Sequence, residues 1–515
     1  MIAIPRRTGS SLRSHAAKLL LAAALLGVLG FSVDRAFAAE PPAIPREFRA
    51  MWIASVGNID WPSRPGLPIA QQQQELRTLL DGARGLKLNA VILQVRTACD
   101  ALYASALEPW SEYLTGRMGQ APGGGWDPLK FACAEAHARG LELHAWVNPF
   151  RARYHGAISP ISADHISARH PDWVLSYVRH LWLDPGNPAV RDWSLQVITD
   201  IVRRYDVDGL HMDDYFYPYP EKVGSSNAPF PDDVSYQRYR RSGGTLERDD
   251  WRRDCVSQFV QRLNTSIHAT KPWVKFGISP FGIWRPGFPA GIKGFDSFAS
   301  LHADARLWLQ NGWCDYCAPQ LYWGLDRKEQ AFQPLLRWWI EQNHTGRWIV
   351  PGLSSASIGK DRRSDDIANQ VRLTRQESGA AGVVFWNASS LRDNLGGLAA
   401  TLNHDVFARP ALVPAAPWLG RRAPERPVIE ARFGNWSHTL RLAWKPGAGE
   451  PVSVLVMQSR TGNQWTTELL SGTPGGRELR RKGPNPFPDE VRVSAVGRTG
   501  IQGESAVFLR PPNVR

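Results

Sequence analysis

The chain lacks the residues and motifs that define several large classes of protein. Only five of its 515 residues are cysteines, and an odd number argues against a framework of disulfides. Gly-Lys-Ser/Thr and Gly-x-Gly-x-x-Gly loops are absent, which disfavours a nucleotide-binding enzyme. Neither a Gly-x-Ser-x-Gly elbow nor a His-x-His pair occurs, so a serine hydrolase and a metal-dependent barrel hydrolase are also disfavoured. We therefore expect neither a cofactor nor a metal.

The first 38 residues have the pattern of a secretory signal peptide. Four basic residues precede an apolar run from Leu19 to Phe31, and Ala36-Phe37-Ala38 is a small-x-small cleavage site. The apolar run is too short for a membrane-spanning helix. No cysteine lies in or just after it, so we expect no lipid anchor. The mature protein is expected to be secreted or periplasmic, with no stable membrane attachment.

Basic side chains outnumber acidic ones even after this segment is removed. The formal net charge is +13 for the whole chain, and residues 1–38 contain five Lys or Arg and one Asp. The mature chain thus keeps 56 basic and 47 acidic residues, a net charge of +9. This charge suits a protein that works near anionic polymers. No basic run with interleaved aromatic residues predicts binding to nucleic acid.

Strand-like and helix-like segments alternate between residues 48 and 404. The strand-like segments are apolar along their length, which predicts a parallel sheet covered by helices. We expect eight strands, which begin near residues 48, 90, 141, 209, 274, 316, 348 and 382. Eight such units predict an α/β fold of the (β/α)8 TIM barrel type. A doubly wound sheet is the alternative, but the count of eight and the polar residues at many strand ends favour the barrel.

The composition changes after residue 405. Residues 406–425 are rich in Pro, Ala and Arg and predict a linker. The following short alternating runs predict a small C-terminal β-sandwich, and residues 493–500 resemble the closing hairpin of a fibronectin type III module. The predicted domains are a signal peptide at 1–38, a barrel catalytic domain at 39–405, a linker at 406–425 and a sandwich at 426–515.

The segment from Gly209 to Pro218 is the strongest candidate for chemistry. It is a short buried strand that runs into an aromatic loop. Alternation along the strand places His211, Asp213 and Tyr215 on one face. A buried acidic residue at a strand end costs free energy unless it is paired or used. A lone aspartate there is more often a helix cap, but the adjacent pair Asp213 and Asp214 favours a functional role.

The C-terminal ends of the other predicted strands carry hydrogen-bonding and aromatic side chains. The active site of a barrel lies at these ends. The candidate substrate-binding residues are Asp60, Trp61, Arg96, Asp100, Asn148, Arg151, His211, Tyr215, Gln320, Tyr322, Trp323, Trp386 and Asn387. The chain also has 22 tryptophans, several of them at strand ends, where an indole can form a stacking floor for a sugar ring. The array suits a polyhydroxylated substrate.

Hydrolysis of a glycosidic bond needs two carboxyl groups, one protonated as the acid and one ionised as the nucleophile or base. Asp213 fits the ionised role, with Arg96 and His211 as partners that would lower its pKa. The candidates for the second carboxyl group are Asp214, Asp100 and Asp60. We predict Asp213 and Asp214 as the catalytic residues.

Five segments of the chain resemble the glycosyl hydrolase-like 10 family. They are residues 46–52, 110–116, 208–218, 318–323 and 382–386. The resemblance covers about residues 45–405 in chain order. It implies an exported bacterial barrel hydrolase, and some members act on peptidoglycan glycan strands stripped of their peptides. Members that are lipoproteins carry a cysteine that this chain lacks, so the resemblance implies the envelope location but not the anchor.

The sequence thus predicts an exported glycoside hydrolase whose substrate partner is a cell-wall glycan strand. It would cleave peptide-free peptidoglycan by carboxylate acid/base chemistry at the C-terminal face of a barrel. Two alternatives remain open. One is a glycan-binding envelope protein without catalysis, and the other is a glycosidase that acts on another polysaccharide.

The export segment gives a direct test of the predicted processing. When the full chain is expressed in a bacterium, we expect the exported protein to begin at Ala39, because the small side chains of Ala36 and Ala38 fit a signal peptidase. Mass spectrometry of the N-terminal peptide measures this. A variant with bulky residues at both alanines is the control and should stay unprocessed. An exported wild-type protein that retains Met1 would contradict the prediction.

Overall fold

The computed structural model describes residues 40–434, 439–480 and 487–511. The predicted signal peptide lies outside these residues. No helix within the described ranges is long and apolar enough to cross a membrane. The same ranges contain no group of His, Cys, Asp and Glu side chains that could hold a metal ion. The five cysteines are buried, and their thiols are free.

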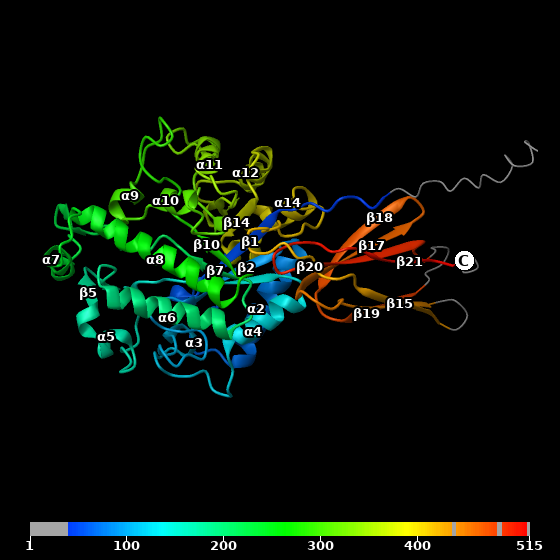
Figure 1. Cartoon of the computed structure of the whole chain (residues 1–515), viewed down its shortest axis with the longest axis horizontal. Helices are drawn as coiled ribbons and strands as arrows, with labels where there is room; N and C mark the ends of the chain where they lie inside the picture. The colour runs from blue at the N-terminus through cyan, green and yellow to red at the C-terminus, as the bar shows by residue number, and fades with distance from the viewer. Residues whose placement is uncertain (1–39, 435–438, 481–486, 512–515) are drawn as a thin grey trace, which may run out of the picture.

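A parallel sheet forms the centre of the larger part of the molecule (Figure 1). Its strands are buried almost throughout, as their apolar sequences predicted. In spatial order they are β12 (Trp348–Ile349), β11 (Tyr316–Cys317), β10 (Lys275–Ile278), β7 (Gly209–Met212), β3 (Glu142–Val147), β2 (Ala90–Arg96), β1 (Phe48–Ile53), β14 (Gly382–Trp386) and β13 (Gly352–Ser354). Only Val350 and Pro351 separate β12 from β13 in the chain, so the order begins and ends in one segment. Pro351 has no N–H for the ladder, which explains why this segment is split into two short strands.

Helices cover the outer face of this sheet. The two longest, α6 (Pro188–Arg204) and α8 (Arg248–Thr270), lie side by side (Figure 1). The side chain of Asn187 caps α6 by accepting a hydrogen bond from the Ala189 N–H, and Pro188 occupies the first helical position. The other covering helices are α2 (Ile69–Gly85), α4 (Pro128–Ala138), α10 (Ala305–Gln310), α11 (Phe332–Glu341), α12 (Ser364–Gln376), α13 (Ala388–Arg392) and α14 (Leu398–His404).

Alternate residues of the sheet belong to two separate cores. Met51 and Val91 face the helices and join the large outer core. Ala50, Trp52 and Tyr316 point to the other face and join a smaller inner core. Because side chains alternate along a strand, one short segment supplies both cores. The inner core is the one that underlies the candidate site.

The segments that follow the strand ends contain small elements that the sequence pattern did not predict. Such elements are too short for a clear periodic signal. Several of them, including β5, α5 and α7, lie at the end of the molecule away from the C-terminal strands (Figure 1). They are η2 (Val56–Asn58), α3 (Glu112–Thr115), β4 (Arg151–Arg153), α5 (Ile166–Arg169), η3 (Pro171–Trp173), β5 (Val174–Tyr177), β6 (His180–Leu183), β8 (Lys222–Val223), β9 (Ser226–Asn227), α7 (Asp233–Arg241), α9 (Ser297–Ser300), η4 (Ser355–Ser357) and η5 (Leu395–Gly397).

The C-terminal part consists of two antiparallel sheets. One contains β15 (Val428–Phe433), β16 (Thr439–Lys445) and β19 (Gly475–Arg480). The other contains β18 (Gln464–Ser471), β17 (Val452–Thr461), β20 (Glu490–Gly497) and β21 (Ala506–Leu509). Leu442 from the first sheet and Leu455 and Val493 from the second belong to one apolar core. The alternating polar and apolar residues of these strands explain this one-sided burial.

The segment predicted as a linker packs against the parallel sheet. The Leu412 N–H donates to the Pro45 carbonyl oxygen, and the Leu412 carbonyl accepts from the Glu47 N–H, both at 2.9 Å. The Trp418 indole donates to the Asp315 carboxylate at 2.8 Å. These contacts place the segment at the N-terminal ends of the strands, opposite the ends where β7 leads into its loop.

Arg498, in the turn after β20, joins the C-terminal sheets to the parallel sheet. Its guanidinium donates to Asp208 at 2.6 Å and to Asp206, and its carbonyl oxygen accepts a hydrogen bond from Lys275 Nζ at 2.9 Å. Asp208, which directly precedes β7, is only 2% exposed. Burial opposes its negative charge, but Arg498 and His137 hold the pKa of Asp208 well below its usual value.

Replacing Arg498 tests whether this contact stabilises the fold. In Arg498→Met, Asp208 keeps its buried charge but loses its main partner, so we expect a loss of about 3–5 kcal/mol in the free energy of unfolding. Chemical denaturation measures it. Arg441→Met is the matched control, because Arg441 pairs with Glu478 on the exposed surface of the same part of the chain and should cost about 1 kcal/mol or less. Equal losses in the two variants would contradict the prediction.

Candidate active site

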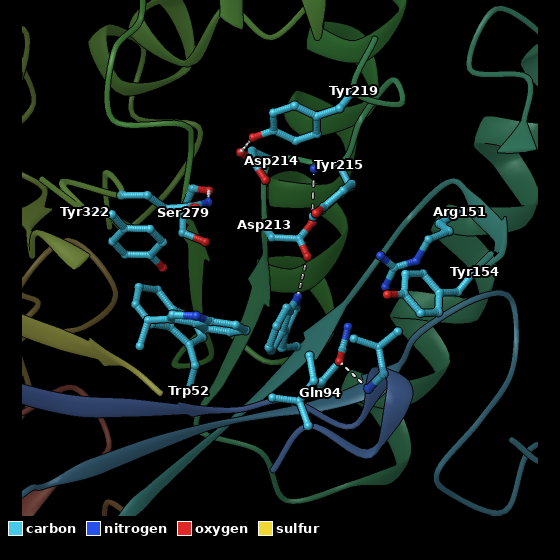
Figure 2. A pocket seen from close by; sticks show the side chains of 15 residues that line it. Trp52, Gln94, Arg151, Tyr154, Asp213, Asp214, Tyr215, Tyr219, Ser279 and Tyr322 are labelled. Carbon is cyan, nitrogen blue, oxygen red and sulfur yellow. Dashed lines mark hydrogen bonds between the residues drawn. The ribbon is translucent and has the colours of Figure 1, made fainter. Parts of the chain in front are cut away.

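A cavity of about 280 Å³ lies at the C-terminal ends of the parallel strands (Figure 2). It has aromatic walls with a small number of polar groups that converge on its centre, as ligand sites commonly do. The lining residues are Trp52, Val56, Ile59, Gln94, Trp146, Arg151, Tyr154, Asp213, Asp214, Tyr215, Tyr219, Ser279, Gln320, Tyr322 and Trp386.

Asp213 directly follows β7, and three donors fix its carboxylate. The Trp146 indole N–H at 2.9 Å and the Asn148 side-chain amide at 2.6 Å both donate to Oδ2. The backbone N–H of Tyr215 donates to Oδ1 at 3.1 Å. Burial raises the pKa of Asp213 above its ordinary value, although Arg151 and these donors favour the charged form. The side chain is therefore held in one orientation in the cavity.

Asp214 lies next to Asp213 but has a different environment. Its Oδ2 accepts a hydrogen bond from the Tyr219 hydroxyl. Burial, together with the negative charge of Asp213, raises the pKa of Asp214 to about 7. Two neighbouring carboxyl groups in a buried site do not readily ionise together. Below about pH 7 the pair therefore retains a proton, and Asp214 is the residue that carries it.

Arg151 is the only cationic side chain that lines the cavity in the described part of the chain. Its Nε donates to the Thr97 carbonyl at 2.9 Å and its Nη2 to Asn148 Oδ1 at 2.8 Å. Its guanidinium carbon lies 5.2 Å from the centre of the Tyr215 ring. No described residue accepts a hydrogen bond from Nη1, which leaves that group available to a ligand.

Tryptophan and tyrosine rings form one wall of the cavity. The Trp52 ring makes edge contacts with Tyr322 at 6.5 Å and with Trp386 at 6.4 Å between ring centres. Trp146 contacts Trp386 in the same way at 6.2 Å. Such rings provide large, rigid apolar area against which a sugar ring can stack.

A chain of buried polar side chains runs beneath this wall, on the inner face of the sheet. The Trp52 indole donates to His211 Nε2 at 3.1 Å. The Tyr316 hydroxyl lies 3.0 Å from His211 Nδ1 and 2.8 Å from His144 Nδ1, and His144 continues to Glu142 at 3.1 Å. Burial lowers the pKa of His211 well below its usual value, so the ring is neutral and accepts from Trp52. The chain thereby orients the Trp52 indole.

The structure brings together the predicted catalytic pair and part of the predicted binding set. The residues of that set that line the cavity are Arg151, Tyr215, Gln320, Tyr322 and Trp386. Asn148 and His211 lie directly beneath the cavity. Asn148 contacts Asp213, and His211 contacts Trp52.

Six predicted binding residues are not among those that line the cavity. They are Asp60, Trp61, Arg96, Asp100, Trp323 and Asn387. Asp60 braces its loop by accepting hydrogen bonds from the Ala54 N–H at 2.8 Å and from Ser389. Arg96 is fully buried in an ion pair with Glu108 and does not contact Asp213. Their polar groups serve the protein itself rather than a ligand.

The other four predicted binding residues outside the cavity also make contacts within the protein. Asp100 accepts hydrogen bonds from the Thr97 hydroxyl at 2.6 Å and from two backbone N–H groups. Trp61 is fully buried, Trp323 packs edge-on against Phe281, and Asn387 caps α13. Loops that follow strands need side-chain partners for their backbone groups. A polar residue at a strand end therefore often forms hydrogen bonds with the backbone of its own loop.

Several lining residues were outside the predicted binding set. Tyr219 continues the aromatic run that starts at Tyr215, and this run was the available signal. Tyr154 follows β4, whose three residues show no recognisable period. Four more residues at or near strand ends were outside the predicted binding set: Trp52, Gln94, Trp146 and Ser279.

A cavity at the C-terminal ends of a parallel sheet, with aromatic walls and buried carboxyl groups, suits a glycoside hydrolase. Known proteins agree. Glycosyl hydrolase YngK of Bacillus subtilis (strain 168) is 41% identical over 409 residues, which cover 76% of this chain and 78% of that protein. Glycosyl hydrolase DigH of Escherichia coli (strain K12) is 35% identical over 326 residues, or 59% and 72% of the two chains.

The chain belongs to the glycosyl hydrolase-like 10 family, whose model matches residues 47–367. This confirms the resemblance found in the sequence. Solved structures with a related chain path include the PgaB (BpsB) glycoside hydrolase domain from Bordetella bronchiseptica, with a TM-score of 0.45 and 13% identity over 70% of this chain and 98% of that one. The catalytic domain of a beta-amylase from Paenibacillus polymyxa has a TM-score of 0.47 and 12% identity over 72% and 100%.

The raised pKa of Asp214 predicts a pH-dependent effect on stability. Above pH 7 the folded protein must hold a buried charge that the unfolded chain, with a pKa of about 3.9, carries in water. Asp214→Asn should therefore be more stable than wild type at pH 8, by on the order of 2–4 kcal/mol in the free energy of unfolding, and so unfold at a higher temperature. At pH 4 the variant should show no advantage. Calorimetry at both pH values measures this. A difference that does not change with pH would contradict it.

Proposed function

We propose that this glycoside hydrolase is exported and cleaves bacterial cell-wall glycan, with peptide-free peptidoglycan strands as the substrate. Asp214 acts as the general acid, and Asp213 acts as the ionised carboxylate. The observation that carries the proposal is the contrast between these neighbours: three donors fix Asp213, whereas Asp214 has a pKa of about 7. Glycosidic hydrolysis needs one carboxyl group in each state.

The two carboxyl groups divide the chemistry between them. Asp214 donates its proton to the glycosidic oxygen as the bond to the anomeric carbon breaks. The negative charge of Asp213 stabilises the positive charge that develops on the sugar. Trp52 and Trp386 provide surfaces for the sugar rings, and burial of the site strengthens each electrostatic contact.

Arg151 supports an anionic substrate. Peptide-free peptidoglycan carries a free lactyl carboxylate on every muramic acid, and the available Nη1 of Arg151 can bind it. The net charge of +9 after signal removal favours encounter with such a polymer. A neutral polysaccharide would offer this arginine no charged partner, which makes another glycan the weaker candidate.

We also propose that the two parts of the molecule are a closed barrel and a β-sandwich. We take the parallel sheet as a closed (β/α)8 barrel, because β12 and β13 are two halves of one strand that pair with β11 and β14 respectively. The two C-terminal sheets, which share one core, are taken as a fibronectin type III-like sandwich. The domain limits of 39–405, 406–425 and 426–515 stay a prediction.

A glycan-binding protein without catalysis is the rival function. It explains the aromatic wall, but it gives no reason to bury two adjacent carboxyl groups where one must take up a proton. Turnover of purified glycan strands separates the two functions, because a binding protein releases no new reducing ends.

Amide variants of the two aspartates test the assigned roles. Asp213→Asn and Asp214→Asn should each lower kcat on peptide-free glycan strands by on the order of 10³, about 4 kcal/mol of transition-state stabilisation. Mass spectrometry of released fragments measures the rate. Asp100→Asn is the matched control, since Asp100 lies outside the cavity, and it should keep near-normal kcat. Full activity in both cavity variants would place the chemistry elsewhere.

A further inference from the structure

We propose that the 2-acetamido group of the substrate sugar, rather than a protein side chain, attacks the anomeric carbon, and that Asp213 and Tyr322 hold this group in place. The inference rests on the proposed function and specifies its substrate class. The sugar on the non-reducing side of the cleaved bond must carry an N-acetyl group.

The number and position of the carboxyl groups lead to this mechanism. Asp213 and Asp214 are the only carboxyl groups among the described residues that line the cavity, and both follow the same strand. A protein nucleophile or base usually faces the acid across the sugar ring. At the ends of the strands that follow β7, the cavity presents Ser279, Gln320 and Trp386 instead. The attacking group must then come from the substrate or from Asp213.

The hydrogen bonds of Asp213 favour a positioning role for its carboxylate. A carboxylate has about four acceptor positions, and protein donors fill two on Oδ2 and one on Oδ1. The remaining position on Oδ1 matches the single N–H of an acetamido group. A carboxylate held by three donors is also less free to move onto the anomeric carbon and form a bond there.

Tyr322 supplies the complementary donor. Its hydroxyl makes no hydrogen bond to any described residue, yet the burial of the ring and the charges of Asp214 and Asp213 raise its pKa well above the usual value. The hydroxyl thus stays protonated, and Tyr322 lines the same cavity as the carboxyl pair. Figure 2 shows Tyr322 on the opposite side of the cavity from Arg151, with Asp213 and Asp214 between them. A donor there can bind the acetamido carbonyl oxygen while Asp213 binds the N–H.

Aromatic side chains near Tyr322 provide an apolar place for the acetamido methyl group. Trp52 makes an edge contact with Tyr322 and another with Trp386. The buried His211 accepts a hydrogen bond from the Trp52 indole, which keeps this wall fixed. The site therefore offers an acceptor, a donor and an apolar surface in the combination that an acetamido group needs.

The reaction balances with water as the only co-reactant. The acetamido oxygen forms a bond to the anomeric carbon as the bond to the leaving oxygen breaks, and that oxygen takes the proton of Asp214. The product of this step is a cyclic oxazolinium ion, whose N–H is paired with Asp213. Water then attacks the anomeric carbon, gives a proton to Asp214 and reopens the ring. Two inversions at one carbon give net retention of configuration.

Chemically modified glycan strands test the inference with the mature protein. Peptide-free strands are de-N-acetylated and then re-acylated with either acetyl or trifluoroacetyl groups. Fluorine withdraws electrons from the carbonyl oxygen, so the trifluoroacetyl strands should be cleaved at least 10²-fold more slowly. The re-acetylated strands control for the chemical treatment and should match untreated ones. Competition against untreated strands measures whether the trifluoroacetyl strands still bind.

The outcomes separate this inference from the proposed function. Equal cleavage of both re-acylated strands, or an inverted product anomer in early NMR spectra, would overturn assistance by the acetamido group while the proposed function stands. Failure to cleave untreated and re-acetylated strands would overturn the proposed function itself. Slow cleavage of bound trifluoroacetyl strands with a retained anomer supports the inference.

Tyr322→Phe adds a second readout. The variant keeps the ring contacts with Trp52 and loses only the hydroxyl, so kcat should fall about 10- to 100-fold on N-acetylated strands while KM changes little. The slow cleavage of trifluoroacetyl strands, whose carbonyl oxygen is a poor acceptor, should fall much less in Tyr322→Phe. An equal loss on both kinds of strand would show that the hydroxyl acts independently of the acetamido group.

Discussion

The site depends on one electrostatic constraint: two carboxyl groups, adjacent in the chain and buried in the same cavity, resist being charged together, so the pKa of Asp214 rises to about 7. The surroundings decide which of them holds the proton. Trp146, Asn148 and a backbone N–H stabilise the charge of Asp213, whereas Asp214 has the Tyr219 hydroxyl. Two identical residues thus come to differ in the pH range over which they are charged.

The inner face of the parallel sheet supports this arrangement from below. His144, His211 and Tyr316 fill the space beneath the cavity with hydrogen bonds that run in one direction, from the Trp52 indole towards Glu142. The Ser279 hydroxyl also lies 3.0 Å from His211 Nε2, so hydrogen-bonding groups hold the His211 ring at both nitrogens. An apolar core would pack as well but would leave the indole N–H of Trp52 without a partner.

The sequence predicted the features that depend on period and composition. Continuous apolar strands alternating with helices identified the parallel sheet, and the pair Asp213-Asp214 at the end of one strand identified the centre of the site. The sequence pattern did not predict how the loops orient their side chains. Asp60, Arg96 and Asp100 have the right type and position along the chain, but the loops that follow their strands turn these side chains toward backbone groups and Glu108. Tyr154 reaches the cavity from a three-residue strand with no periodic signal.

The position of Arg498 near the end of the chain affects when the parallel sheet gains its full set of contacts. A ribosome makes this residue after every strand of the parallel sheet. Until it arrives, Asp208 has only His137 and Lys275 to balance its charge at the start of the strand that leads to Asp213. A chain cut short before β20 carries all the catalytic groups but lacks the support beneath them. The support beneath the cavity is in this way tied to the C-terminal sheets.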